Sequence, residues 1–425
     1  MTMQRYRDCA AGSEVGGPAL PSGAAWNVNL NNGNSNWNNH DNDNHARAVR
    51  AGECHGVVSF PALYSAWRAA RRGKKPSADQ LAFDCNWLDR LFELQDRLNA
   101  CAWHPSAPTC FVQLTPKARE IHAPAFADRV VHHWLVPQLE ELYEPSFIHD
   151  CYSNRKGKGT HSAVQRLRQF VRQVHSGQGG GYYLQLDVAN FFNSIHRATL
   201  WQMLKRRMER ADLPAIGQRA THALLNYSTE RTGVVMACTP TERAAVPAHK
   251  RLENAPPGCG IAIGNLSSQF FANVYLDRLD QFVKHELKAP RYLRYVDDFV
   301  LVHQSRVQLE EWRARIETFL QAELRLQLKA EQKLEPIASG IDFLGYVVRP
   351  THTVVRRRVV AHCIAKLTAF QRHPAAASPG QIRSVWASYE GHFRHASSYR
   401  LRARIHHRFP WLAQAVQHTK EPSWL

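Results

Sequence analysis

The sequence has little that would suit a membrane-spanning, secreted or zinc-finger protein. No apolar run approaches the roughly 18 residues that a membrane helix needs, and no signal peptide opens the chain. The nine cysteines form no C-x-x-C pair and no finger-like spacing with histidine. They therefore indicate reduced thiols, and together these absences predict a cytoplasmic protein with no membrane partner.

Acidic residues are also scarce. The 425 residues include 36 Asp and Glu against 54 Lys and Arg, which gives a formal net charge of +18. The basic residues are densest at 68–75, 155–172, 204–210 and 356–358. An excess of this size predicts a polyanionic partner such as nucleic acid, with binding that weakens steeply as salt is added.

Against this basic background, two adjacent carboxylates lie in RYLRYVDDFVLV, residues 291–302. Their apolar and aromatic flanks predict a strand, a two-residue turn and a return strand. Asp297 and Asp298 would then share one small volume at the tip, where a divalent cation with oxygen ligands relieves their mutual repulsion. The alternative is a pair of aspartates in an ordinary surface turn.

A third carboxylate, Asp187, ends another predicted apolar strand. The pattern D-x-x-x-F-F that begins there, followed later by Y-V-D-D, resembles motifs A and C of the reverse transcriptase palm. The resemblance implies that Asp187, Asp297 and Asp298, helped by the carbonyl of Val188, bind two Mg²⁺ ions, which Mn²⁺ could replace. Two such ions ~3.5–4 Å apart activate a primer 3′-hydroxyl and stabilise the departing pyrophosphate.

Phe192 lies five residues after the first of these aspartates. In reverse transcriptases an aromatic residue at this place packs against the sugar of the incoming nucleotide and leaves no room for a 2′-hydroxyl. The resemblance therefore implies dNTPs as substrates. The alternative is that Phe192 is a core aromatic beside Phe191.

The resemblance continues in order from about Tyr64 to His395. Residues 115–135 look like the fingers segment in which Lys117 and Arg119 hold the triphosphate, and two cations one residue apart on a strand share a face. The alternative for both is solvated surface charge.

Further basic residues follow the fingers segment. Arg155, Lys156 and Lys158 stand among glycines, which permit close approach to a phosphate backbone and predict a nucleic-acid contact; a plain basic loop is the alternative. Downstream, Lys333 resembles the lysine that protonates the leaving pyrophosphate, with an exposed loop charge as the alternative. Gly345 would allow the tight bend of the primer grip.

Residues 258–283 resemble motif B, a turn that leads into a helix under the templating base. Most retroviral, retron and intron enzymes have Q-G-x-x-x-S-P there, whereas this chain has Ile263 and Gly264 at the start and Gln269 at the end. An aliphatic residue followed by G-x-x-x-S-Q is the hallmark of reverse transcriptases from diversity-generating retroelements. Loss of a polar group beside the nascent base pair weakens its positioning, which suits their errors opposite template adenine.

These motifs predict an α+β fold: a right-hand polymerase with mixed fingers, an antiparallel-sheet palm and a short helical thumb. We expect helices and fingers over 56–180, palm over 181–349 and thumb over 350–425, with no room after the thumb for an RNase H domain. The segment 229–257, between motifs A and B, is expected to be loop-like and carries no motif.

The first 55 residues do not resemble a polymerase, because they contain a dense asparagine tract over 25–50. Disordered low-complexity sequence is one interpretation. The other is that they translate a template repeat, since adenine-rich repeats encode asparagine as AAY codons. Five residues of the tract each differ from such a codon by one substitution at an adenine: Ser35, His40, Asp41, Asp43 and His45. Neither interpretation supplies a catalytic residue.

Taken together, the resemblance implies an RNA-directed DNA polymerase that makes error-prone cDNA from a template-repeat RNA. Its partners would be template RNA, primer, cDNA and dNTPs, and the family works with a small basic accessory protein that forms an oligomeric ring. Two alternatives stay open: a retron-type or antiphage-defence reverse transcriptase, and a non-catalytic, maturase-like RNA-binding protein on the same scaffold.

Overall fold

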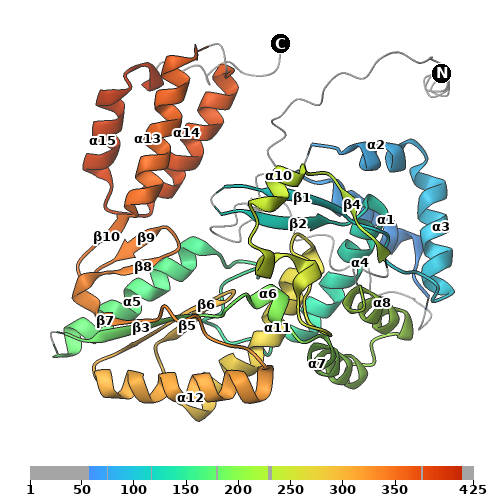
Figure 1. The fold of residues 1–425 in the computed structure, drawn as a ribbon, viewed down its shortest axis with the longest axis horizontal. Helices are drawn as coiled ribbons and strands as arrows, with labels where there is room; N and C mark the ends of the chain where they lie inside the picture. Colours follow the sequence, from blue (N-terminus) through green and yellow to red (C-terminus); the bar gives the residue numbers. More distant parts are fainter. Residues whose placement is uncertain are drawn as a thin grey trace.

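The computed structural model describes residues 57–413, apart from 74, 116, 179, 228–231 and 375–376. The asparagine-rich leader, residues 1–55, lies outside the described residues. Within them, the elements form three groups, each with its own β-sheet (Figure 1).

The palm is built on a four-stranded antiparallel sheet in the order β5-β6-β3-β7. Its strands are β3 (Tyr182–Asp187), β5 (Tyr292–Tyr295), β6 (Asp298–His303) and β7 (Lys333–Pro336). Helices α11 (Leu266–Gln281) and α12 (Arg306–Leu324) lie below it in Figure 1, whereas α5 (Thr160–Gln178) packs on its other face.

Strands β3, β5 and β6 are buried on both faces, which explains their largely apolar sequences, whereas the edge strand β7 is mostly exposed. Alternate residues of β3 enter different cores: Leu184 and Leu186 pack with α11 and α12, whereas Tyr183 packs with α5. A shift of register by one residue would exchange these faces and would move Asp187 away from Asp298.

The fingers contain a small sheet in the order β2-β1-β4. Strand β1 (Thr109–Gln113) pairs antiparallel with β2 (Arg119–Ala123) and parallel with the short β4 (Val235–Met236). The surrounding helices are α1 (Phe60–Arg71), α2 (Ala78–Cys85), α3 (Trp87–Asn99), α4 (Phe126–Tyr143), α7 (Arg197–Arg210) and α8 (Ala215–Leu225). The segment expected to be a loop contains β4, α10 (Pro240–Ala244) and the 3₁₀ turns η1 (Ala248–Lys250) and η2 (Leu252–Asn254).

The third sheet, β10-β9-β8, lies between the palm and the thumb: β8 and β9 pack in the same core as α5, whereas Val355 of β10 and three thumb helices form a core of their own. The strands are β8 (Ile341–Phe343), β9 (Tyr346–Val348) and β10 (Thr353–Val355); the helices are α13 (Arg357–Arg372), α14 (Pro379–Arg394) and α15 (Tyr399–Arg408). Ser378 begins α14 with a capping box to Gln381 and a proline at the first helical position, a strong local start signal.

The remaining short elements lie outside the thumb helices. They are α6 (Phe191–Ser194), the π-helical turn η3 (Phe282–Glu286) and η4 (Ile337–Ser339).

No helix in the described part of the chain is both long and apolar enough to cross a membrane.

Candidate active site

The predicted hairpin is present and carries the two adjacent aspartates. Strands β5 and β6 pair up to Tyr295 and Asp298, which leaves Val296 and Asp297 as the two-residue turn. Val296 has φ of 55°, a left-handed conformation that is unusual for a β-branched residue and must be held by its surroundings. The guanidinium of Arg294 supplies one such restraint, because its Nη1 donates to the carbonyl of Val296 at 2.9 Å.

Arg294 is itself fixed by a buried network beneath the turn. Its guanidinium donates to both carboxylate oxygens of Asp280 on α11, with the shortest contact 2.6 Å, and neither side chain is exposed. The Tyr292 hydroxyl donates to the same carboxylate at 2.6 Å. Burial raises the pKa of this tyrosine, and the nearby Asp280 charge adds to the effect, so the hydroxyl keeps its proton. The palm helix is thereby tied directly to the hairpin.

The third predicted carboxylate, that of Asp187, lies on the neighbouring strand β3. Asp187, the last residue of β3, lies directly opposite Asp298 in the β3–β6 ladder. The amide of Val188 donates to the carbonyl of Asp297 at 3.4 Å, so the end of β3 also meets the turn. Asp187 and Asp297 are 110 positions apart in the chain, and the sheet brings them together. All three acids therefore lie close to one another.

The electrostatics of this cluster fit a site for divalent cations. Burial is the main cause that raises the pKa of Asp297 to about 6 and that of Asp298 to about 7, and the Asp187 charge contributes to both increases. Of Asp297 and Asp298, Asp298 alone accepts a side-chain hydrogen bond that lowers its pKa. The donor is the Gln185 amide, at 3.1 Å. The Oδ1 atom of Asp187 is buried and lacks a hydrogen-bond partner among the described residues. Crowded carboxylates with an unused buried oxygen are suitable ligands for a metal of the Mg²⁺ type.

Lys329 is a site residue that the sequence analysis missed. Its ammonium forms a short contact with Asp187 Oδ2, and its amide donates to the carbonyl of Asp187 at 2.8 Å. Lys333, the lysine singled out from the sequence, lies in β7 opposite Gln185, and its side chain is exposed. Both residues belong to the short run KAEQK, where spacing alone gives no reason to prefer one.

The two cations predicted to hold a triphosphate interact electrostatically with the carboxylates. Burial lowers the pKa of Lys117, and the neighbouring charges of Lys329, Lys250 and Arg119 lower it further. The Arg119 charge in turn lowers the pKa of Asp297. Cations from the fingers and acids from the palm therefore share one electrostatic site, as a polyanionic substrate bridged by metal requires.

Phe192 and the motif B turn lie side by side next to this site. Phe192 is half-buried against the palm core, and its carbonyl accepts from the amide of Ile261 at 3.0 Å. Two residues later, the carbonyl of Ile263 accepts from the amide of His122 in β2 at 2.9 Å. Gly264 has φ of 115°, and a Cβ there would lie 2.8 Å from the side chain of Ile121, so glycine is needed.

Gln269 occupies the first turn of α11, where it is half-buried. Motif B therefore links the palm helix to the fingers sheet through backbone contacts.

The basic loop after α4 divides into a structural and an exposed part. The Arg155 side chain is only 6% exposed, and its guanidinium binds Glu144, at 2.8 Å, and the carbonyls of Ile148 and Cys151. Lys158 donates to the carbonyl of His149, whereas Lys156 is exposed. Arg155 thus holds the loop together, a role that differs from the predicted phosphate contact and leaves Lys156 as the accessible cation.

Gly345 occupies the turn between β8 and β9 together with Leu344. Both have positive φ, 87° and 49°, as a two-residue hairpin turn requires. A Cβ on Gly345 would lie 3.1 Å from the ring of His392 in α14. The bend predicted for the primer grip is present and is packed closely against the thumb.

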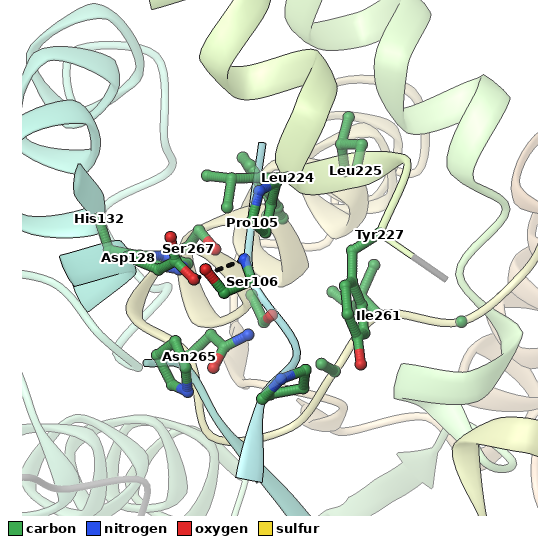
Figure 2. Close-up of a pocket in the computed structure, with 16 residues that line it drawn as sticks. Pro105, Ser106, Asp128, His132, Leu224, Leu225, Tyr227, Ile261, Asn265 and Ser267 are labelled. Carbon is green, nitrogen blue, oxygen red and sulfur yellow. Dashed lines mark hydrogen bonds between the residues drawn. The ribbon is translucent and has the colours of Figure 1, made fainter. Parts of the chain in front are cut away.

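A separate small cavity lies behind the motif B turn (Figure 2). It has a volume of about 30 Å³, enough for about one water molecule. The labelled side chains include Asp128, which accepts from the amide of Ser106 at 2.7 Å, and His132, whose pKa is lowered to about 3 by burial. It is too small for a nucleotide and shares no residue with the carboxylate cluster.

Three acids at the meeting point of two antiparallel palm strands, faced by fingers cations and followed by a helical thumb, define a right-hand polymerase. Residues 112–348 match the family model described as reverse transcriptase (RNA-dependent DNA polymerase). That span is more than half of the chain, and the chain belongs to this family. The predicted fold class and the reverse transcriptase family are thereby confirmed, whereas the assignment to diversity-generating retroelements stays a prediction.

Similarity to individual proteins is lower. Protein YkfC of Escherichia coli (strain K12) is 22% identical over 275 residues, which cover 57% of this chain and 64% of YkfC. A telomerase from Candida albicans, solved in complex with a fragment of telomeric RNA, has a TM-score of 0.44 and 12% identity over 79% of this chain and 60% of that one. An apo telomerase from Candida tropicalis has a TM-score of 0.39 and 10% identity, over 59% and 55%.

Proposed function

We propose that this chain catalyses RNA-directed synthesis of DNA from dNTPs, with two Mg²⁺ ions, or Mn²⁺, bound by Asp187, Asp297 and Asp298. The observation that carries the proposal is the pairing of Asp187 with Asp298 beside the Asp297 turn, opposite Lys117 and Arg119. Bound metal would polarise the primer 3′-hydroxyl and offset the charge of the departing pyrophosphate.

The protein side chains bind and orient the substrates. Lys117 and Arg119 hold the triphosphate, and Phe192 lies where an aromatic ring excludes a ribose 2′-hydroxyl. The carbonyl of Val188, whose backbone is fixed against Asp297, is a further metal ligand. A lysine of the 329–333 run neutralises or protonates the leaving pyrophosphate: Lys333 is the residue expected from the sequence, and Lys329 is the one in contact with Asp187.

Primer extension on an RNA template tests this function. The wild-type protein should incorporate dNTPs in the presence of Mg²⁺, and Asp297→Asn or Asp298→Asn should abolish incorporation while RNA binding persists. RNA binding by the wild-type chain without incorporation, even with native RNA and an accessory protein present, would instead support the maturase-like scaffold.

The finer proposal is that the enzyme copies a template-repeat RNA with frequent errors at adenine and so diversifies a target gene. The support is Ile263 at the start of motif B, where related enzymes have glutamine, followed by Gly264 and Gln269. Its partner would be a small basic oligomeric accessory protein, and its site of action the cytoplasm.

Sequencing of the cDNA products tests the finer proposal. Wild-type cDNA should carry substitutions concentrated opposite template adenine, and Ile263→Gln should reduce them selectively. Uniformly accurate cDNA, together with the lack of a repeat pair near the gene, would favour the retron or antiphage-defence alternative.

A further inference from the structure

A second cluster of ligand-type side chains lies in the fingers sheet. Cys110 on β1 lies directly opposite His122 on β2, and Glu120 precedes His122 by two residues, so all three side chains share one face of the sheet. All three are buried, and their ligand atoms lie within 4.8 Å of one another. Cys238, the second residue after β4, interacts electrostatically with Cys110.

His122 is the observation that points to a ligand. Its side chain is only 5% exposed, yet neither ring nitrogen has a hydrogen-bond partner among the described residues. The Glu120 carboxylate lies close by, with its Oε2 3.6 Å from Nε2, beyond hydrogen-bond distance. A buried imidazole without a partner is costly, and a bound cation would satisfy it.

The surroundings are those of a metal site with a supporting second layer. The Glu120 carboxylate accepts from the amide of Leu252 at 3.1 Å and is 3.4 Å from Nε of Arg243, which fixes its orientation. The cluster lines a cavity of about 340 Å³, bounded on its other side by Val234 and Met236, which provides a route for an ion.

We propose that Cys110, Glu120 and His122 bind one Zn²⁺ ion, with the Cys238 thiolate as the fourth ligand. Thiolate and imidazole favour Zn²⁺ over the Mg²⁺ or Mn²⁺ expected at the palm aspartates. Ligand atoms around tetrahedral zinc are ~3.5–4 Å apart, so the spread of up to 4.8 Å among Cys110, Glu120 and His122 closes with side-chain movements of about 1 Å. Cys238 lies outside this group of three and would move in as the fourth ligand. The positive charge of Arg243 offsets part of the charge of two thiolates and a carboxylate.

The ion would fasten the segment between motifs A and B to the fingers. Cys238 belongs to this segment, which continues through α10, beside β1 in Figure 1, and then through both 3₁₀ turns. Near the other end of the segment, the carbonyl of His249 accepts from the side chain of Asn190 at 2.6 Å. Asn190 lies three residues after Asp187, next to the polymerase site. In strand β2, the proposed ligands Glu120 and His122 lie on either side of Ile121, whose side chain packs against Gly264 of motif B. Zinc at this place therefore stabilises the fingers wall of the site without taking part in the chemistry.

Metal analysis of the full-length chain tests the proposal independently of polymerase activity. Protein purified under reducing conditions should contain about one zinc per chain, and exchange for Co²⁺ should give a thiolate-to-cobalt charge-transfer band. The three palm aspartates cannot give that band, because they supply no sulfur. Cys110→Ser and His122→Asn should lose both signals, whereas Cys363→Ser, which changes a buried thiol in the thumb core, should keep them.

Cys238→Ser provides a second test of zinc binding if Cys110→Ser and His122→Asn fail to fold. Cys238 is only half-buried, at the edge of the cluster, so its substitution should leave the fold intact. This variant should lose zinc to a competing chelator faster than the wild type, and chelation of the wild type should expose residues 232–257 to protease. Wild-type protein with neither zinc nor a cobalt–thiolate band overturns the proposal. So does zinc that is retained equally by the Cys110 and His122 variants, or a Cys110–Cys238 disulfide in freshly purified protein.

Discussion

Arg294 and Asp280 form an ion pair with neither side chain exposed, and the same guanidinium holds the carbonyl of Val296 in the turn that carries Asp297. A buried charge of this kind is tolerated only with its partner in place. The pair therefore connects the stability of the palm to the geometry of its catalytic turn.

Asp280→Ala should lower the free energy of unfolding by about 3–5 kcal/mol, because it leaves the Arg294 charge buried and unpaired. Chemical denaturation measures the effect. Glu323→Ala is the matched control: it breaks the pair between Arg278 and Glu323, whose side chains are about half exposed, and should cost no more than about 1 kcal/mol. Equal losses in the two variants would contradict a special role for the buried pair.

In the metal-free protein, Asp297 and Asp298 should contribute stability that is lost as pH rises from about 4 to 7. Burial raises the pKa of Asp297 to about 6 and of Asp298 to about 7, so the folded state binds protons more tightly than the unfolded state. Stability from these protons is present below the unfolded pKa of about 4 and is lost as pH passes the folded values.

Melting temperatures measured in a chelator across this pH range should therefore fall more for the wild type than for Asp298→Asn, which has one fewer of these titrations. The effect of one aspartate should be on the order of 1–3 kcal/mol. Mg²⁺ should restore stability at pH 7, and polymerase activity should need more Mg²⁺ at pH 6, where protons compete for the carboxylates. A wild-type slope that matches the variant would rule out this titration.

Lys329→Ala should reduce nucleotide incorporation more than Lys333→Ala does. Lys329 contacts Asp187, whereas Lys333 extends from the edge strand β7. A group that acts in proton transfer contributes roughly 10²–10⁴-fold, so single-turnover incorporation should fall by at least about 10²-fold. The larger loss in Lys333→Ala would restore the assignment made from the sequence.

Gly264→Ala should destabilise the protein by about 1–3 kcal/mol and weaken incorporation, because its φ of 115° is strained for any other residue and its Cβ would lie 2.8 Å from Ile121. Gly391→Ala is the control, because it lies inside α14 with no atom within 4 Å of its Cβ. That substitution should be neutral or slightly stabilising through helix propensity. Thermal unfolding of both variants, with extension assays, distinguishes the two effects.

Phe192→Ala should admit ribonucleotides while dNTP incorporation persists. The half-buried ring would otherwise occupy the space of a 2′-hydroxyl, and its removal opens that space. The ratio of kcat/KM for dNTP to that for the matching rNTP is the measurement, and we expect it to fall by at least about 10-fold. An unchanged ratio would assign Phe192 to the palm core alone.

The sequence by itself determined the palm strands β3, β5 and β6, the hairpin with its two aspartates and the reverse transcriptase family. These features are local: short runs rich in apolar and aromatic residues predict strands, and a two-residue turn follows from where two such runs stop. Asp187 could be added because it ends a strand of the same kind, although its pairing with Asp298 is visible only in the folded sheet.

Only the tertiary structure decided which polar side chains meet. Lys329 rather than Lys333 contacts Asp187, because the chain after α12 runs back along the end of β3. Arg155, which looks like any other basic loop residue in sequence, is held by Glu144 and two carbonyls. The proximity of Cys110 and His122 depends on the register of β1 with β2. Such contacts join residues far apart in the chain, and their energies depend on burial and orientation that local sequence does not encode.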